Sequence, residues 1–208
     1  LSLGGWYLTD KDVQDFAKAF KWVSLAAEQG EPKAQLILGG MYYDGVGVEK
    51  DLNKAVAWFQ KSAEQGDVEA QYALGNTYFI GKGVEKNLPK AFEWYQKAAE
   101  QGNASAQYAL GYMYEHGEGI AKNLPKASEW YQKSAEQGNA SAQWSLGYMY
   151  KYGKGVVKNL PKAFEWYQKS AEQGDDDAQY ILGYMYEYGE GIAKNLPKAF
   201  EWYQKAAE

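Results

Sequence analysis

Few side chains in this sequence could perform catalysis or hold a metal ion. His116 is the only histidine among the 208 residues, and there is no cysteine. A site with two histidine ligands, a histidine relay, a thiolate zinc site and a cysteine nucleophile are therefore excluded. Asp175, Asp176 and Asp177 are consecutive carboxylates that could hold a cation. We interpret them instead as a helix cap, because a short polar residue recurs at this point along the chain. We expect no metal, no cofactor and no catalytic residue.

A second candidate for chemistry is the segment from Gly147 to Lys154, which resembles a phosphate-binding loop. It has five residues between its glycines where that motif has four, and the residues before it have a helical pattern instead of a strand pattern. We therefore reject a nucleotide site, and the protein is predicted not to be an enzyme.

The elements that position all these residues come from a repeat. The glycine of a Glu-Gln-Gly motif stands at positions 30, 66, 102, 138 and 174, always 36 residues apart. A fixed period of this length is typical of a solenoid, in which each repeat buries its apolar face by stacking on its neighbours. We predict a single repeat domain over 1–208. It consists of a degenerate N-terminal capping repeat at 1–30, full repeats at 31–66, 67–102, 103–138 and 139–174, and a slightly truncated last repeat at 175–208.

Each repeat carries signals for two helices. In the repeat 103–138 the first helix is expected behind Asn103, whose side chain can accept a hydrogen bond from an unpaired N–H group. Gly117 and Gly119 are expected to end this helix and turn the chain, because glycine accepts positive φ without steric penalty. The second helix is expected behind Asn123 and ends at Glu-Gln-Gly. The predicted fold class is all-α, an α-solenoid of helix-turn-helix repeats.

A glycine also stands inside every first helix, at positions 39, 75, 111, 147 and 183. Glycine in a helix interior costs about 1 kcal/mol relative to alanine. We expect these glycines to allow a neighbouring helix to approach closely. The tryptophans of the second helices, from Trp58 to Trp202, are predicted to lie in the core.

Charge and hydropathy limit the partners. The net charge is −5, and the basic residues form no stripe, so we expect no nucleic-acid partner. No run of apolar residues approaches the roughly 18 needed to cross a bilayer, so we expect no membrane insertion.

The repeat resembles the SLR family (Sel-one-like repeats), a relative of the tetratricopeptide repeat with a longer loop between its helices. Five units carry the resemblance, and its residues in the repeat 103–138 are Ala106, Leu110-Gly111, Tyr114, Gly117-x-Gly119, Lys126-Ala127, Trp130, Lys133-Ser134-Ala135 and Gly138. The resemblance implies a right-handed α-superhelix that binds a protein or peptide on its concave face. Many bacterial members are exported and contact a host, so a periplasmic or secreted location is favoured by the resemblance alone.

In tetratricopeptide-like proteins the concave wall is formed by the first helix of each repeat. The corresponding positions here are strongly aromatic, and some of them vary between repeats while the Leu-Gly pair does not change. Such variation on a fixed scaffold favours a recognition surface, with aromatic side chains as anchors. The alternative is that these rings pack between adjacent helices. The candidate groove residues are Tyr72, Asn76, Phe79, Tyr108, Tyr112, Glu115, His116, Trp144, Tyr148, Lys151, Tyr152, Tyr180, Tyr184, Glu187 and Tyr188.

The leading prediction for function is a non-enzymatic adaptor that captures a peptide or protein segment in this groove. One alternative is a cell-wall or β-lactam-related hydrolase, because cysteine-rich SLR relatives have been linked to β-lactam binding. No serine here is followed three residues later by lysine, so that serine-enzyme signature is absent. A further alternative is a structural module that self-associates through its C-terminal repeat, where Phe200, Trp202 and Tyr203 have no following repeat to cover them.

Overall fold

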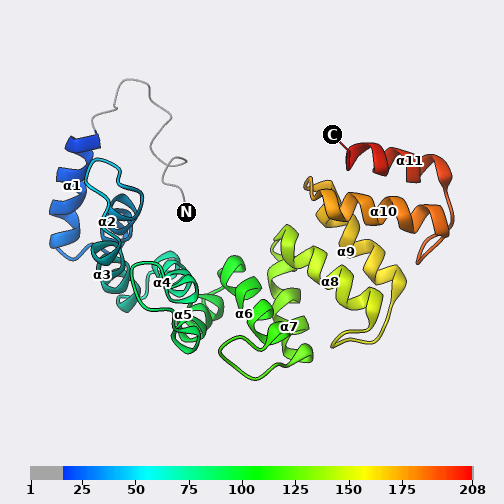
Figure 1. The fold of residues 1–208 in the computed structure, drawn as a ribbon, viewed down its shortest axis with the longest axis horizontal. Coiled ribbons are helices and arrows are strands. Elements are labelled where there is room, and N and C mark those ends of the chain that lie inside the picture. Colours follow the sequence, from blue (N-terminus) through cyan, green and yellow to red (C-terminus); the bar gives the residue numbers. More distant parts are fainter. Residues whose placement is uncertain (1–15, 208) are drawn as a thin grey trace. The chain divides into compact units, whose positions relative to one another are not determined.

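The computed structural model describes residues 16–207, and all the regular secondary structure within them is α-helix (Figure 1). The chain divides into two compact units, one ending at Asn103 and the other beginning at Ala104. The helices of the first unit are α1 (Phe16–Glu28), α2 (Pro32–Asp44), α3 (Leu52–Glu64), α4 (Val68–Ile80) and α5 (Leu88–Glu100). Those of the second are α6 (Ala104–His116), α7 (Leu124–Glu136), α8 (Ala140–Tyr152), α9 (Leu160–Glu172), α10 (Asp176–Tyr188) and α11 (Leu196–Lys205). The all-α repeat fold is confirmed, and the single domain over 1–208 stays a prediction.

The predicted helix boundaries are confirmed by the caps. Asp67, Asn139 and Asp175 each accept a hydrogen bond from the backbone N–H three residues later, at 2.9, 2.9 and 2.7 Å. Asn123 caps α7 in the same way, with 3.0 Å to the backbone N–H of Lys126. Gly153 ends α8 at φ 70°, in the left-handed region that glycine adopts readily.

The glycines inside the first helices do allow a close approach. A Cβ atom added at Gly147 would lie 2.7 Å from Cδ1 of Tyr167 on α9, and Gly111 faces Tyr131 on α7 in the same way. The ring that occupies this space belongs to the residue directly after each tryptophan. These tyrosines are the central buried rings of the second unit, since Tyr131 is 1% exposed and Tyr167 is 0% exposed.

The tryptophans differ from the prediction. Only Trp166 is buried, whereas Trp58, Trp94, Trp130 and Trp202 are half-buried. The lysine three residues later in the same helix lies over each of these five rings, with its Nζ 3.9 to 4.2 Å from the ring centroid. A lysine stem can cover an aromatic ring while its ammonium stays in water, so the four half-buried tryptophans lie at the edge of the core.

Polar side chains join successive repeats at fixed positions. In the second unit, Gln143 of α8 donates to the carbonyl of Ala135 at 3.1 Å and accepts from Gln173 at 2.7 Å. Ser170 of α9 donates to the carbonyl of Ala140 at 2.9 Å. In the first unit, Gln71 bonds to Ala63 in the same manner, at 3.2 Å. These bonds link the helix ends of neighbouring repeats and hold each first helix in register with the second helices around it.

The two terminal repeats match the predictions in part. Leu3, Gly4 and Tyr7 of the predicted capping repeat lie outside the described residues, and α1 supplies the remaining helix. At the other end Phe200 is 70% exposed, whereas its equivalent Phe164 is 8% exposed. Tyr203 is not uncovered as expected, because it packs against Gly183 within its own repeat. Self-association through this repeat stays a prediction.

In the described part of the chain, every helix is too short or too polar to cross a membrane.

Candidate binding site

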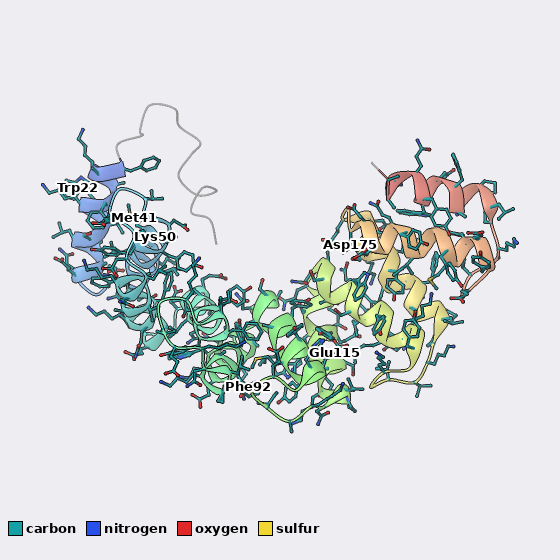
Figure 2. The ribbon with its side chains drawn as sticks, in the orientation of Figure 1. Trp22, Met41, Lys50, Phe92, Glu115 and Asp175 are labelled. Carbon is teal, nitrogen blue, oxygen red and sulfur yellow. The ribbon has the colours of Figure 1, made fainter. Side chains whose placement is uncertain are left out.

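The first helices of the second unit form the wall of an open hollow of about 460 Å³. It lies against α6, α8 and the start of α10, and Figure 2 labels two of its carboxylates, Glu115 and Asp175. Aromatic, acidic and small hydroxyl side chains share its lining. The lining residues are Tyr108, Tyr112, Glu115, His116, Tyr131, Ser141, Trp144, Ser145, Tyr148, Lys154, Asp175 and Asp177.

The helical repeat explains why aromatic rings line this surface. Residues four apart lie on the same face of a helix, so Trp144, Tyr148 and Tyr152 of α8 follow one another along it. The rings of Trp144 and Tyr148 are nearly parallel, at 6° with centroids 5.6 Å apart, and the centroid of Tyr152 lies 4.7 Å from that of Tyr148. On α6, Tyr112 and His116 stack with centroids 4.1 Å apart. The result is a row of neighbouring aromatic rings on each of the two first helices α6 and α8.

His116 makes a local contact within its own helix. Its Nδ1 lies 3.0 Å from the carbonyl oxygen of Tyr112, which can only accept, so Nδ1 carries the hydrogen and donates. The second nitrogen remains for other contacts. Among residues 16–207, no group of three or more His, Asp or Glu side chains is arranged to hold a metal ion.

A buried tyrosine of the second helix fixes the carboxylate of Glu115. The hydroxyl of Tyr131 donates to Oε2 of Glu115 at 2.8 Å. Burial raises the pKa of Tyr131 far above its usual range, and the negative charge of Glu115 raises it further. Tyr131 therefore stays a neutral donor at physiological pH. The α10–α11 repeat has the same arrangement, in which Tyr203 donates to Glu187 at 2.7 Å.

The α8–α9 repeat breaks this pattern. Lys151 stands where Glu115 and Glu187 stand in the other two repeats, and an ammonium cannot accept a hydrogen bond. The hydroxyl of Tyr167 is buried and has no hydrogen-bond partner in the described part of the chain. Lys151 instead pairs with Glu190 at 3.2 Å and lies over the ring of Tyr184 at 4.8 Å. The lysine at position 151, where the other two repeats of this unit have a glutamate, therefore leaves the buried Tyr167 hydroxyl without an acceptor among the described residues.

Sequence reasoning missed the residue between the two loop glycines, which folds back onto the first helix. Lys154 donates from Nζ to the hydroxyl of Tyr148 at 2.7 Å and lies 4.5 Å from the centroid of that ring. Its pKa is raised, first by this hydrogen bond and also by the negative charge of Glu115. Glu118, at the equivalent position, lies 3.5 Å from the hydroxyl of Tyr112. The available signal was variation, because this position reads Val46, Lys82, Glu118, Lys154 and Glu190 along the chain.

The predicted cap at the start of α10 also contributes to the hollow. Asp175 accepts from the backbone N–H of Ala178 and lines the hollow at the same time, while Asp177 lines it from the first turn. Ser145 of α8 also lines the hollow, and it donates to the carbonyl of Ser141 at 2.9 Å. The Nε1 atom of Trp144 is buried and has no acceptor among the described residues.

The structure brings part of the predicted groove together. Six of the predicted residues line the hollow: Tyr108, Tyr112, Glu115, His116, Trp144 and Tyr148. A further six lie on α8 and α10 of the same unit and do not line it: Lys151, Tyr152, Tyr180, Tyr184, Glu187 and Tyr188. Tyr72, Asn76 and Phe79 lie on α4 in the first unit.

The packing alternative also holds for several of these rings. Tyr72 and Phe79 lie against Tyr95 with ring centroids 5.9 and 6.3 Å away, and Tyr108 lies 5.6 Å from Tyr131. Asn76 accepts from the hydroxyl of Tyr95 at 2.7 Å. These side chains therefore pack against buried tyrosines of the core and also belong to the candidate groove residues. Binding at this surface stays a prediction.

The fold is an α-solenoid of helix-turn-helix repeats. Its helix pairs recur, a glycine in each first helix packs against a ring of the second helix, and glutamine side chains form hydrogen bonds between successive repeats. The Sel1 repeat matches the residues 2–31, 32–67, 68–103, 104–139, 140–175 and 176–208. The chain belongs to the Sel1 repeat family. Members of this family typically act as scaffolds for protein–protein interaction.

Solved structures agree with this assignment. The c5321 protein, a protective antigen of uropathogenic Escherichia coli with an SLR fold, superposes with a TM-score of 0.90 at 44% identity over 93% of this chain. The chain spans 42% of the length of that protein. A Sel1 repeat protein of Oxalobacter formigenes has a TM-score of 0.84 at 38% identity, covering 91% of this chain and 81% of its own.

Helicobacter pylori cysteine rich protein B has a TM-score of 0.52 at 32% identity, with 64% of this chain and 96% of its own covered. No curated protein sequence matches the chain. Export from the cell stays a prediction.

Proposed function

We propose that this protein is an adaptor that binds a peptide or protein segment along the first helices of its second unit, centred on the hollow between α6, α8 and the start of α10. One observation carries the proposal. Six residues selected by their position in the repeat line one hollow of about 460 Å³, together with polar groups that can fix the orientation of a bound chain. Scaffolding of this kind is also the typical role of the family.

The variation between repeats supports the same surface. Leu110 and its equivalents are buried and unchanged, whereas the groove positions and the loop residue between the glycines change from repeat to repeat. Rigid aromatic rings with polar tips provide contact area at low entropic cost, which suits the recognition of an extended segment.

The experiment is to fill the hollow without removing any packed ring. Ser141 is exposed and lines the hollow, so Ser141→Trp adds bulk there. Wild type and variant are immobilised and used to capture partners from an extract of the source organism. We expect a partner retained by wild type to be lost by Ser141→Trp.

The matched control is Ser105→Trp, the same substitution one repeat earlier on α6 and outside the hollow. It should capture the same partner as wild type, and circular dichroism should show equal helix content for all three proteins. If Ser141→Trp keeps the partner, binding occurs elsewhere and the proposed site is wrong.

A further inference from the structure

The charged groups around the hollow are predominantly acidic. Glu115, Asp175 and Asp177 contribute carboxylates, and Lys154 contributes the one ammonium of the lining. Glu115 already accepts from Tyr131, and Asp175 from the backbone of α10. A carboxylate has two oxygens with about four lone-pair sites, so each can accept further hydrogen bonds. Asp177 is exposed and has no hydrogen-bond or ionic partner within residues 16–207.

The aromatic rings that line the hollow, like its carboxylates, favour a positively charged ligand. The face of an aromatic ring carries negative potential and attracts a cation placed over it. The chain uses this contact repeatedly: the ammonium of Lys133 lies 4.1 Å from the centroid of Trp130, and that of Lys151 lies 4.8 Å from the centroid of Tyr184. In the hollow, Lys154 covers the ring of Tyr148. The hollow therefore already holds one cation of the protein itself, and it retains an excess of carboxylates.

From this charge and geometry, and on the basis of the adaptor function above, we propose that the hollow receives the arginine side chain of a bound peptide segment. The planar guanidinium stacks on aromatic faces and donates up to five hydrogen bonds in a fork that matches a carboxylate. Glu115 is held in place by Tyr131, so one acceptor is fixed before the segment binds, which lowers the entropic cost of binding.

An acidic segment is disfavoured at the same place. The N-terminus of α10 would attract an anion on its own, because unpaired N–H groups and the helix dipole favour negative charge there. Here Asp175 accepts from one of those N–H groups, and Asp176 and Asp177 follow in the first turn. A glutamate from a partner would meet these carboxylates, and like charges repel.

Lys154 has a defined part in this proposal. Its ammonium occupies the face of Tyr148 and offsets one carboxylate, so it competes with an incoming guanidinium. Removing its charge should make arginine binding tighter. A purely structural role for Lys154 predicts no such gain.

The test uses the full chain and fluorescently labelled heptapeptide mixtures, in which the six flanking positions are randomised and only the central residue is fixed. The central residue is arginine, its uncharged analogue citrulline, or glutamate. Fluorescence anisotropy measures the affinity of each mixture. We expect arginine to bind roughly tenfold more tightly than citrulline, as for a cation on a partly desolvated ring beside a carboxylate. Glutamate should bind most weakly.

Charge-removing variants locate the effect. Glu115→Gln combined with Asp177→Asn should remove most of the arginine preference, measured as the ratio of the citrulline to the arginine dissociation constant. Glu129→Gln combined with Glu201→Gln removes the same charge at exposed positions outside the hollow and should keep the preference. Lys154→Gln should bind the arginine mixture roughly threefold more tightly, whereas the exposed control Lys158→Gln should not.

The outcomes separate this inference from the adaptor function. Equal binding of arginine and citrulline that Ser141→Trp abolishes would overturn the arginine proposal and keep the peptide groove. If no mixture binds, or if Ser141→Trp leaves binding intact, both proposals fail. An arginine preference that survives Glu115→Gln with Asp177→Asn would place the recognition outside the hollow and contradict the inference.

Discussion

The α6–α7 and α8–α9 repeats of the second unit have the same core and different surfaces. In both, a tyrosine of the second helix packs on a glycine of the first, Tyr131 on Gly111 and Tyr167 on Gly147. The hydroxyl of Tyr131 donates to Glu115, whereas that of Tyr167 has no acceptor among residues 16–207, and Lys151 stands at the position equivalent to Glu115. In the α8–α9 repeat a different surface charge therefore coincides with an unsatisfied hydroxyl in the core.

The largest expected effect tests the contact between glycine and tyrosine that both repeats contain. Gly111→Leu and Gly147→Leu should each lower the free energy of unfolding by roughly 1 to 3 kcal/mol, because the new side chain displaces a buried ring from a packed contact. Urea denaturation followed by circular dichroism measures the change.

The control for this pair is Glu129→Leu, which adds a similar side chain at an exposed position of α7. It should change the stability little. Equal stability of Gly111→Leu and wild type would mean that the helices do not approach as closely as the structure indicates.

The next prediction is that removing the tyrosine hydroxyl changes the stability in a different direction in the two repeats. Tyr131→Phe removes a hydrogen bond to a carboxylate and should cost about 1 kcal/mol, a value at the low end because Glu115 is partly exposed to solvent. Tyr167→Phe removes a buried hydroxyl that has no partner in the described part of the chain, so it should be neutral or stabilise the protein by about 1 kcal/mol.

The two substitutions are chemically identical, so each is the control for the other. Melting curves and urea midpoints should shift in opposite directions, or only for Tyr131→Phe. A loss of stability in Tyr167→Phe equal to that in Tyr131→Phe would show that the Tyr167 hydroxyl has an acceptor after all, and the comparison would fail.

The period of the sequence and its caps were sufficient to predict the fold. Asn, Asp and Gly at fixed intervals determine where each helix begins and ends, and the interior glycines predicted the close helix contact. The prediction that the tryptophans of the second helices lie in the core holds for Trp166 and is wrong for the other four, which are half-buried. Trp130 and Tyr131 are adjacent and therefore about 100° apart around the helix, so periodicity identified the apolar face without showing which ring lies at its centre.

The candidate site was predictable only in part. Helical spacing placed Tyr112 and Tyr148 on one surface, since residues on equivalent turns of equivalent helices repeat their orientation. The contribution of Lys154 was missed because it depends on how the loop folds back over α8. Asp177 was interpreted as part of a helix cap. It lines the hollow together with rings of the preceding repeat, and this position depends on how successive repeats pack, which the sequence of one repeat does not show.

The smallest expected effect comes from giving the Tyr167 hydroxyl an acceptor like the one that Tyr131 has in the α6–α7 repeat. Lys151→Gln places an amide oxygen near the Tyr167 hydroxyl as an acceptor, and its amide nitrogen can still donate toward Glu190. The gain of a hydrogen bond for a buried hydroxyl, about 1 kcal/mol, is partly offset by the lost ion pair, so we expect a net stabilisation of about 0.5 kcal/mol. A double-mutant cycle isolates this term, because Lys151→Gln in the Tyr167→Phe background has no hydroxyl to satisfy and should lose the gain. If the gain persists without the hydroxyl, it comes from the surface charges around Glu190, and the unsatisfied tyrosine is not the feature that distinguishes the α8–α9 repeat.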